Sequence, residues 1–190
     1  DYSAVHVPTD QDEQTKEYLR MRDDHKLALK KVKQQILAFC LRHNFRFEGM
    51  SKHWTQAHLK WLRELKPEGL YKEILEEYLL TFDTLTDKLE RLDKRIEELA
   101  SHEAYQENVH KLSCFIGVKT ITALAVLTEV GDFKRFSSAQ HFASFLGLTP
   151  GEDSSGDDQN RLSITKAGNR HLRMLLVEAA QCYTHGQPGY

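Results

Sequence analysis

Large apolar residues recur in a heptad pattern between residues 75 and 99, and this pattern restricts the fold more than any other feature. They occupy successive a and d positions, at Leu75, Tyr78, Phe82, Leu85, Leu89, Leu92, Ile96 and Leu99. A repeat of 3.5 residues places one apolar stripe along a helix, and burying that stripe requires another helix. The pattern therefore predicts a helix over residues 72–103 that pairs within the chain or with another copy.

A second long helix is predicted over residues 11–46, where Thr9 or Asp10 can cap the start. Its apolar stripe follows steps of three and four, at Leu29, Val32, Ile36 and Phe39. A short helix fits residues 55–65. Because little chain separates the long helices, we expect an antiparallel helical (coiled-coil) hairpin with its tip at residues 44–66.

The formal net charge of -2 hides a strong asymmetry along the chain. Residues 20–66 carry twelve Lys/Arg and four Asp/Glu, a net charge of +8, whereas residues 1–19 and 67–103 carry -4 and -6. Histidines and aromatic residues are interleaved with these cations, as on a surface that follows nucleic-acid phosphates. A solvated helix face is the alternative. The predicted nucleic-acid contacts in this block are Arg42, Arg46, Lys52, Lys60 and Arg63.

Three cysteines, Cys40, Cys114 and Cys182, are far apart and lack the spacing of zinc ligands or a disulfide framework. The mean hydropathy is -0.56, and no apolar run approaches the length of a membrane span. Since the sequence begins at Asp1 without Met, we expect a fragment of a larger cytoplasmic protein that has no membrane partner and binds no metal through these residues.

After residue 103 the heptads stop and Gly- and Ser-punctuated helices follow. We therefore expect a helical coiled-coil region over residues 1–103, a small helical domain over residues 104–190, and an all-α fold. A turn at Gly117 leads into a helix after Lys119, which resembles half of a helix-hairpin-helix element. The backbone N–H groups there can bind a phosphate, with Lys119 adding charge. A Gly turn kept only for packing is the alternative.

The next segment predicts a helix with defined ends. Ser137 and Gln140 are spaced as a capping box for a helix that ends at Phe145, and Gly147 can follow it. His141 lies inside this helix between apolar residues, and we assign it no role.

A polar loop is expected over residues 150–160, which contain Ser154, Ser155 and Gly156. Four cations follow, at Arg161, Lys166, Arg170 and Arg173, and Gly168-Asn169 can start a final helix that runs through Tyr183. A serine nucleophile needs a base and cations that stabilise charge on a phosphate. The cations are present without an obvious base. The residues alone therefore also fit an exposed Ser-Ser-Gly turn beside solvated cations.

An ordered series of segments closely resembles bridge-RNA-guided insertion-sequence recombinases, which combine a RuvC-like domain, a coiled-coil pair and a C-terminal Tnp domain. The matching segments are residues 41–44, 54–62, 112–118, 122–123, 129–131, 136–139, 145–150, 154–156, 164–169 and 172–180. This chain is similar to the coiled-coil region and the Tnp domain. The resemblance implies a bacterial DNA transposase that acts on DNA, is guided by a structured RNA, and forms a homo-oligomer (dimer or tetramer).

The resemblance further implies a serine nucleophile that works with Mg²⁺ held by four acidic residues in the RuvC-like domain. The matching serine is Ser155, directly before Gly156, with Ser154 as the second candidate. Without the metal-binding domain the fragment is expected to be inactive alone. The family commonly has glycine and basic residues after this element, whereas Asp157 and Asp158 stand here. The alternative function is a non-catalytic module for nucleic-acid binding and coiled-coil assembly.

Overall fold

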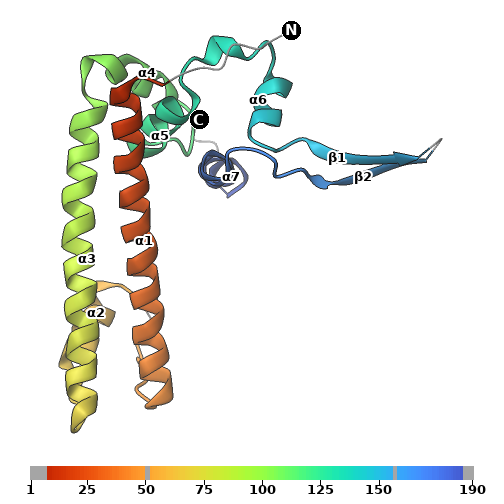
Figure 1. Cartoon of the computed structure of the whole chain (residues 1–190). Helices are drawn as coiled ribbons and strands as arrows, with labels where there is room; N and C mark the ends of the chain where they lie inside the picture. The colour runs from red at the N-terminus through yellow and green to blue at the C-terminus, as the bar shows by residue number, and fades with distance from the viewer. Residues whose placement is uncertain (1–7, 50–51, 156–157, 186–190) are drawn as a thin grey trace. The chain divides into compact units, whose positions relative to one another are not determined.

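The fold is known from a computed structural model that describes residues 8–49, 52–155 and 158–185, with side chains for residues 8–49, 52–151 and 163–182. The helices are α1 (Asp10–Arg42), α2 (Gln56–Glu64), α3 (Leu70–Ala100), α4 (Glu103–Ser113), α5 (Thr120–Val130), the 3-10 turn η1 (Phe133–Arg135), α6 (Ala139–Phe145) and α7 (Arg170–His185) (Figure 1). Two strands, β1 (Pro150–Ser155) and β2 (Asp158–Ile164), precede α7. The predicted all-α class is confirmed, with one β-hairpin added to it.

Two compact units divide the chain, one made of residues 20–94 and the other of residues 1–19 together with 95–190. The division falls within the two long helices, whereas composition places a boundary near residue 103. The difference arises because Leu19, Ile96 and Ala100 pack with α4 and α5 in a single apolar cluster.

Within the unit of residues 20–94, α1 and α3 pack antiparallel (Figure 1). Val32, Ile36 and Phe39 of α1 share an apolar cluster with Leu75 and Phe82 of α3. The heptad a positions in this unit, Leu75, Phe82 and Leu89, are between 2% and 9% exposed. The expected long helical hairpin is therefore present, and α1 covers the heptad stripe at Leu75 and Phe82.

Helix α1 ends at Arg42, four residues earlier than the sequence predicts. Asn44 adopts a left-handed backbone with φ 56°, and the Phe45 N–H donates to the Cys40 carbonyl at 2.9 Å. This pairing is the Schellman arrangement, which satisfies the last carbonyls of a helix and turns the chain away from its axis. At the other end Thr9 is the cap, because its Oγ1 accepts from the Asp12 N–H at 3.1 Å.

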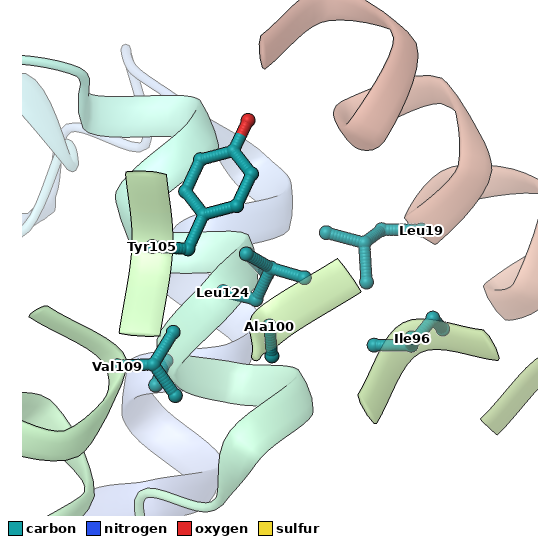
Figure 2. Packing of buried hydrophobic residues seen from close by; sticks show 8 residues of the cluster. Leu19, Ile96, Ala100, Tyr105, Val109 and Leu124 are labelled. Atoms are coloured by element: carbon teal, nitrogen blue, oxygen red, sulfur yellow. The ribbon is translucent and has the colours of Figure 1, made fainter. Parts of the chain in front are cut away.

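The second unit is centred on the cluster shown in Figure 2, which joins the ends of the long helices to α4 and α5. Leu19, Ile96 and Leu124 are at most 3% exposed. The Tyr105 hydroxyl at the edge of this cluster donates to Asp12 Oδ1 at 2.8 Å. Apolar burial and this directional contact together hold the first helix against the C-terminal part of the unit.

Two local predictions are corrected in the C-terminal part. The cap of α6 is Ser138, whose hydroxyl accepts from the His141 N–H, and Ser137 Oγ instead lies 2.6 Å from His141 Nδ1. The polar loop expected at residues 150–160 is largely an antiparallel hairpin, in which Ser155 pairs with Asp158. The strands are not evident from the sequence because residues 151–161 are glycine or polar at successive positions, and the apolar alternation at Leu162 and Ile164 is too short to predict a half-buried strand.

Candidate functional site

The hairpin with the two candidate serines is anchored where two loops meet. One loop joins α6 to β1 and the other joins β2 to α7. The Thr165 N–H donates to the Thr149 carbonyl at 2.9 Å, and the Lys166 N–H donates to the Gly147 carbonyl at 3.1 Å. These bonds continue the pairing of the strands toward the helices. We call residues 145–149 together with 165–169 the hairpin root.

Two glycines allow the two sides of the root to approach one another. A Cβ on Gly168 would meet the Phe145 carbonyl oxygen and would lie 2.7 Å from the Gly147 nitrogen. A Cβ on Gly147, where φ is +66°, would lie 2.9 Å from the Ala167 nitrogen. Since real Cβ atoms do not come this close to backbone atoms, the root requires glycine at both positions.

Arg173 of α7 reaches into the root. Its Nη1 donates to the Leu146 carbonyl at 2.7 Å and lies 3.4 Å from the Lys166 carbonyl oxygen. A guanidinium that donates to backbone carbonyls on both sides of the root fixes their separation. The cation was predicted to contact nucleic acid, and this geometry gives it a structural contact as well.

Asn169 joins the root to α5 and α7. Its Oδ1 accepts from the Leu172 N–H at 3.0 Å, which caps α7, and its Nδ2 donates to Glu129 Oε2 at 2.8 Å. The other carboxylate oxygen of Glu129 lies 3.4 Å from His171 Nδ1. The Glu129 side chain is 4% exposed, so this carboxylate is held inside the unit by directional partners.

The two serines lie near the end of β1. Ser154 pairs with Gln159 and Ser155 with Asp158 across the hairpin, and Arg161 lies next to the pairing in β2, opposite Glu152. Gly156 of the Ser-Ser-Gly element lies outside the described residues. The backbone therefore places both candidate nucleophiles at the part of the hairpin farthest along the strands from the root.

The other predicted contacts of the C-terminal part are separated along the unit. Lys166, with φ 55°, and Arg170 are exposed on the segment that connects the root to α7. Lys119 is exposed at the N-cap of α5 and makes no side-chain capping bond. Gly117 adopts φ +83°, and a Cβ there would meet the carbonyl oxygen of Ala179. The glycine turn is therefore needed for packing against α7, whatever else it binds.

Five cations of the basic block, at or beside the tip of the helical hairpin, are predicted to contact nucleic acid, and all are exposed: Arg42, Arg46, Lys52, Lys60 and Arg63. Arg63 pairs with Asp83 at 2.8 Å, and Lys60 lies 3.8 Å from Glu64. These exposed pairs contribute little to stability and leave the cations accessible to phosphates.

The tip aromatics pack inward against the hairpin. Trp54 stacks on Phe82 with 5.4 Å between ring centroids, and Lys33 Nζ lies 5.3 Å from the Trp54 ring centre. His58 is 1% exposed, and its Nδ1 accepts from the Trp54 N–H at 3.2 Å. Burial, together with the nearby His53, lowers the pKa of His58 below its ordinary value. The aromatic residues thus form the packed interior of the tip, and the tip cations lie on its surface.

Sequence reasoning gave no role to Glu129, although a signal for one was present. It is the one charged residue in the sequence of α5, whose other ten residues are apolar or threonine. A lone carboxylate in such a helix must find partners within the protein. The residues that it meets, Asn169 and His171, are 40 and 42 positions away, which is why their association was not evident.

Comparison with known proteins covers the same region. Residues 109–188 match the transposase IS116/IS110/IS902 family. This segment contains α5, the hairpin, its root and α7, and therefore the whole cluster around Asn169. The resemblance to an insertion-sequence transposase Tnp domain is confirmed over these residues.

Individual relatives extend the similarity to most of the chain. The transposase for insertion sequence element IS1533 of Leptospira borgpetersenii is 31% identical over 96% of this chain and 53% of its own length. The transposase for insertion sequence element IS1328 of Yersinia enterocolitica is 31% identical over 93% of this chain and 52% of its own length. The pilin gene-inverting protein of Moraxella bovis is 31% identical over 66% of this chain and 41% of its own length. The chain thus spans about half the length of the curated relatives it matches.

Two further features bear on the predicted partners. Among the described residues, no helix combines the length and the apolar character needed to cross a membrane. The same residues contain no group of three or more His, Cys, Asp or Glu side chains placed to hold a metal ion.

Proposed function

We propose that this chain is the C-terminal part of a DNA transposase of the IS110/IS116 type and presents a serine nucleophile for strand cleavage and exchange. The observation that carries the proposal is the match of residues 109–188, which includes the hairpin with Ser154 and Ser155. The similarity to a pilin gene-inverting protein supports a reaction in which DNA segments are rearranged.

The hairpin geometry is suited to this task. Its root is fixed by backbone hydrogen bonds, two glycines and the Arg173 guanidinium, while the serines lie at the other end of β1. Adjacent positions of a β-strand belong to opposite faces of the ribbon. A phosphodiester that approaches one face would therefore meet either Ser155 or Ser154, and the element Ser-Ser-Gly favours Ser155.

In the proposed step the serine oxygen attacks a DNA phosphorus. A bond from serine Oγ to phosphorus forms, the bond from phosphorus to one DNA oxygen breaks, and the serine proton passes to a base. The leaving DNA oxygen takes up a proton or is stabilised by cations. Lys166, Arg170 and Arg161 are the basic residues of this chain nearest in sequence to the hairpin and its root. The DNA strand stays joined to the serine through this phosphodiester bond. An oxygen of a second DNA strand then attacks the same phosphorus, and the serine oxygen leaves.

The remaining parts of the proposal concern the whole protein. A RuvC-like domain outside this chain would hold Mg²⁺ through its own carboxylates, and this chain alone would then be inactive. A structured guide RNA would choose the DNA, and a dimer or tetramer would hold the strands to be exchanged. The exposed cations at the tip of the helical hairpin, together with Lys119, would contact nucleic-acid phosphates.

Serine replacement in the whole transposase tests the nucleophile. The Ser155→Ala protein should bind guide RNA and DNA yet form no covalent protein–DNA adduct on a denaturing gel. Ser163→Ala is a matched control, because Ser163 lies in β2 of the same hairpin and is exposed. It should form the adduct normally. If the adduct persists in both Ser155→Ala and Ser154→Ala, neither serine is the nucleophile.

A further inference from the structure

The buried Glu129 carboxylate occupies a site where stability alone does not require a charge. It belongs to α5, whose Val126 and Val130 form an apolar cluster with Leu172 of α7, and these three residues are at most 3% exposed. Withdrawing a carboxylate from water is unfavourable unless hydrogen bonds replace the lost hydration. An apolar side chain would fill such a place without that cost. What the carboxylate adds is direction, because its oxygens accept hydrogen bonds along defined lines.

The Glu129 carboxylate fixes the orientation of the Asn169 side-chain amide. The Nδ2 group donates to Glu129 Oε2 at 2.8 Å, which orients the amide so that Oδ1 faces the Leu172 N–H at 3.0 Å. The backbone N–H of Asn169 meanwhile donates to the Phe145 carbonyl at 3.3 Å. One residue thus connects α5, the start of α7 and the far side of the hairpin root.

We propose that Glu129 and Asn169 form a lock that positions the serine hairpin for strand cleavage. The inference rests on the proposed function of Ser155. Neither residue touches the reacting atoms, and both act through the root. Because the hairpin extends from the root along two strands, a small rotation at Asn169 produces a larger displacement at Ser155. The lock therefore sets where the nucleophile meets the phosphorus.

Asn169→Asp separates this role from helix capping. Aspartate is as good a cap as asparagine, and its carboxylate also suits the positive end of the helix dipole. The bond to the Leu172 N–H is therefore kept. What is lost is the donor to Glu129, and two carboxylates then face one another in a buried place.

The double variant Glu129→Gln/Asn169→Asp restores the contact with donor and acceptor exchanged. The amide introduced at position 129 donates to one oxygen of the carboxylate introduced at position 169, whose other oxygen still accepts from the Leu172 N–H. The oxygen of the new amide keeps its place toward His171 Nδ1. Shape, capping and buried charge are all close to those of the native pair, so the swap isolates the hydrogen bond itself.

The experiment measures the rate of covalent adduct formation by the whole transposase with guide RNA and DNA. We expect Asn169→Asp to lower this rate by a factor between about ten and about 100, the loss that a misplaced reacting group produces. Affinity for DNA and RNA should remain within about threefold. The double variant should recover to within about threefold of the native rate. An equal loss in the double variant, or an unchanged rate in Asn169→Asp, would overturn the lock.

Hydrogen exchange at the Thr165 and Lys166 amides distinguishes failure of the lock from failure of the proposed function. Exchange should accelerate in Asn169→Asp and return toward native protection in the double variant, whether or not Ser155 is the nucleophile. If the adduct survives in both Ser155→Ala and Ser154→Ala, the proposed function fails, and hydrogen exchange alone then tests the lock. Unchanged protection in Asn169→Asp refutes the lock even when Ser155 proves essential.

Discussion

Replacing Gly168 by alanine should loosen the hairpin root while the helical cores stay intact. The new methyl group would meet the Phe145 carbonyl oxygen and lie 2.7 Å from the Gly147 nitrogen and 2.8 Å from the Leu146 carbonyl carbon. All three are backbone atoms, which cannot swing aside as a side chain does. Relief therefore requires separation of the two sides of the root.

The magnitude follows from the overlap. Ordinary carbon contacts lie near 3.5 Å or beyond, so the two sides must separate by about 1 Å, an overpacking cost of about 1–3 kcal/mol. Gly168 does not lie in the left-handed region, so alanine fits its backbone and lowers the entropy of the unfolded chain, which offsets about 0.4–1 kcal/mol. A net loss of about 1–2 kcal/mol corresponds to a fall in Tm of about 2–8 °C for a chain of this size.

Thermal unfolding followed by circular dichroism measures the Tm, and hydrogen exchange at Thr165 and Lys166 reports the root. Gly69→Ala is the control, because Gly69 has φ +59° but nothing within 4 Å of a Cβ. It should lower the Tm through backbone strain alone and leave the root amides protected. If Gly168→Ala unfolds at the native Tm with unchanged exchange at both amides, the close approach of the two loops is refuted.

Two further predictions concern the tip of the helical hairpin, between α1 and α3. His58 has a pKa below its ordinary value of 6.5, so the unfolded chain binds its proton first and stability falls as the pH drops from about 6.5 toward the lowered pKa. Urea unfolding across this range should show the decline, which His58→Gln should abolish and His110→Gln, at an exposed position, should leave intact. Binding of nucleic acid by the tip should weaken steeply with salt, and Lys52→Ala should reduce the slope of log affinity against log salt by about 0.9 if Lys52 contacts a duplex phosphate. An unchanged slope in a filter-binding titration would remove Lys52 from the interface.

The long helices could be predicted because their apolar periodicity is strong and their partner is close in sequence. Leu75, Phe82 and Leu89 follow the heptad and are all buried, and Leu75 and Phe82 share an apolar cluster with residues of the chain's own first helix. The end of α1 was misplaced because Asn44 can continue a helix or adopt a left-handed turn. Phe45 packs against the apolar cluster that contains Leu75 of α3, and this tertiary contact favours the turn.

The hairpin and its root could not be predicted for a different reason. Strand β1 has no apolar residue after Pro150, and the apolar alternation in β2 is limited to Leu162 and Ile164, so the burial pattern is too short to distinguish the two strands from a loop. The requirement for Gly168 comes from Phe145, 23 positions earlier, and the orientation of Asn169 comes from Glu129. The requirement for glycine at position 168 and the partner of Asn169 become evident only when the backbone brings the two loops together.

The placement of the two serines depends on the hairpin root. The serines lie on strands of polar residues, where apolar burial contributes little to their placement. Precision at Ser155 must therefore be transmitted from the root, where glycine packing, the Arg173 guanidinium and the Asn169–Glu129 bond define the geometry. Under the proposed function, substitutions at the root should therefore resemble loss of Ser155 in the rate of strand cleavage, while nucleic-acid affinity, which that proposal assigns to cations elsewhere, stays close to native.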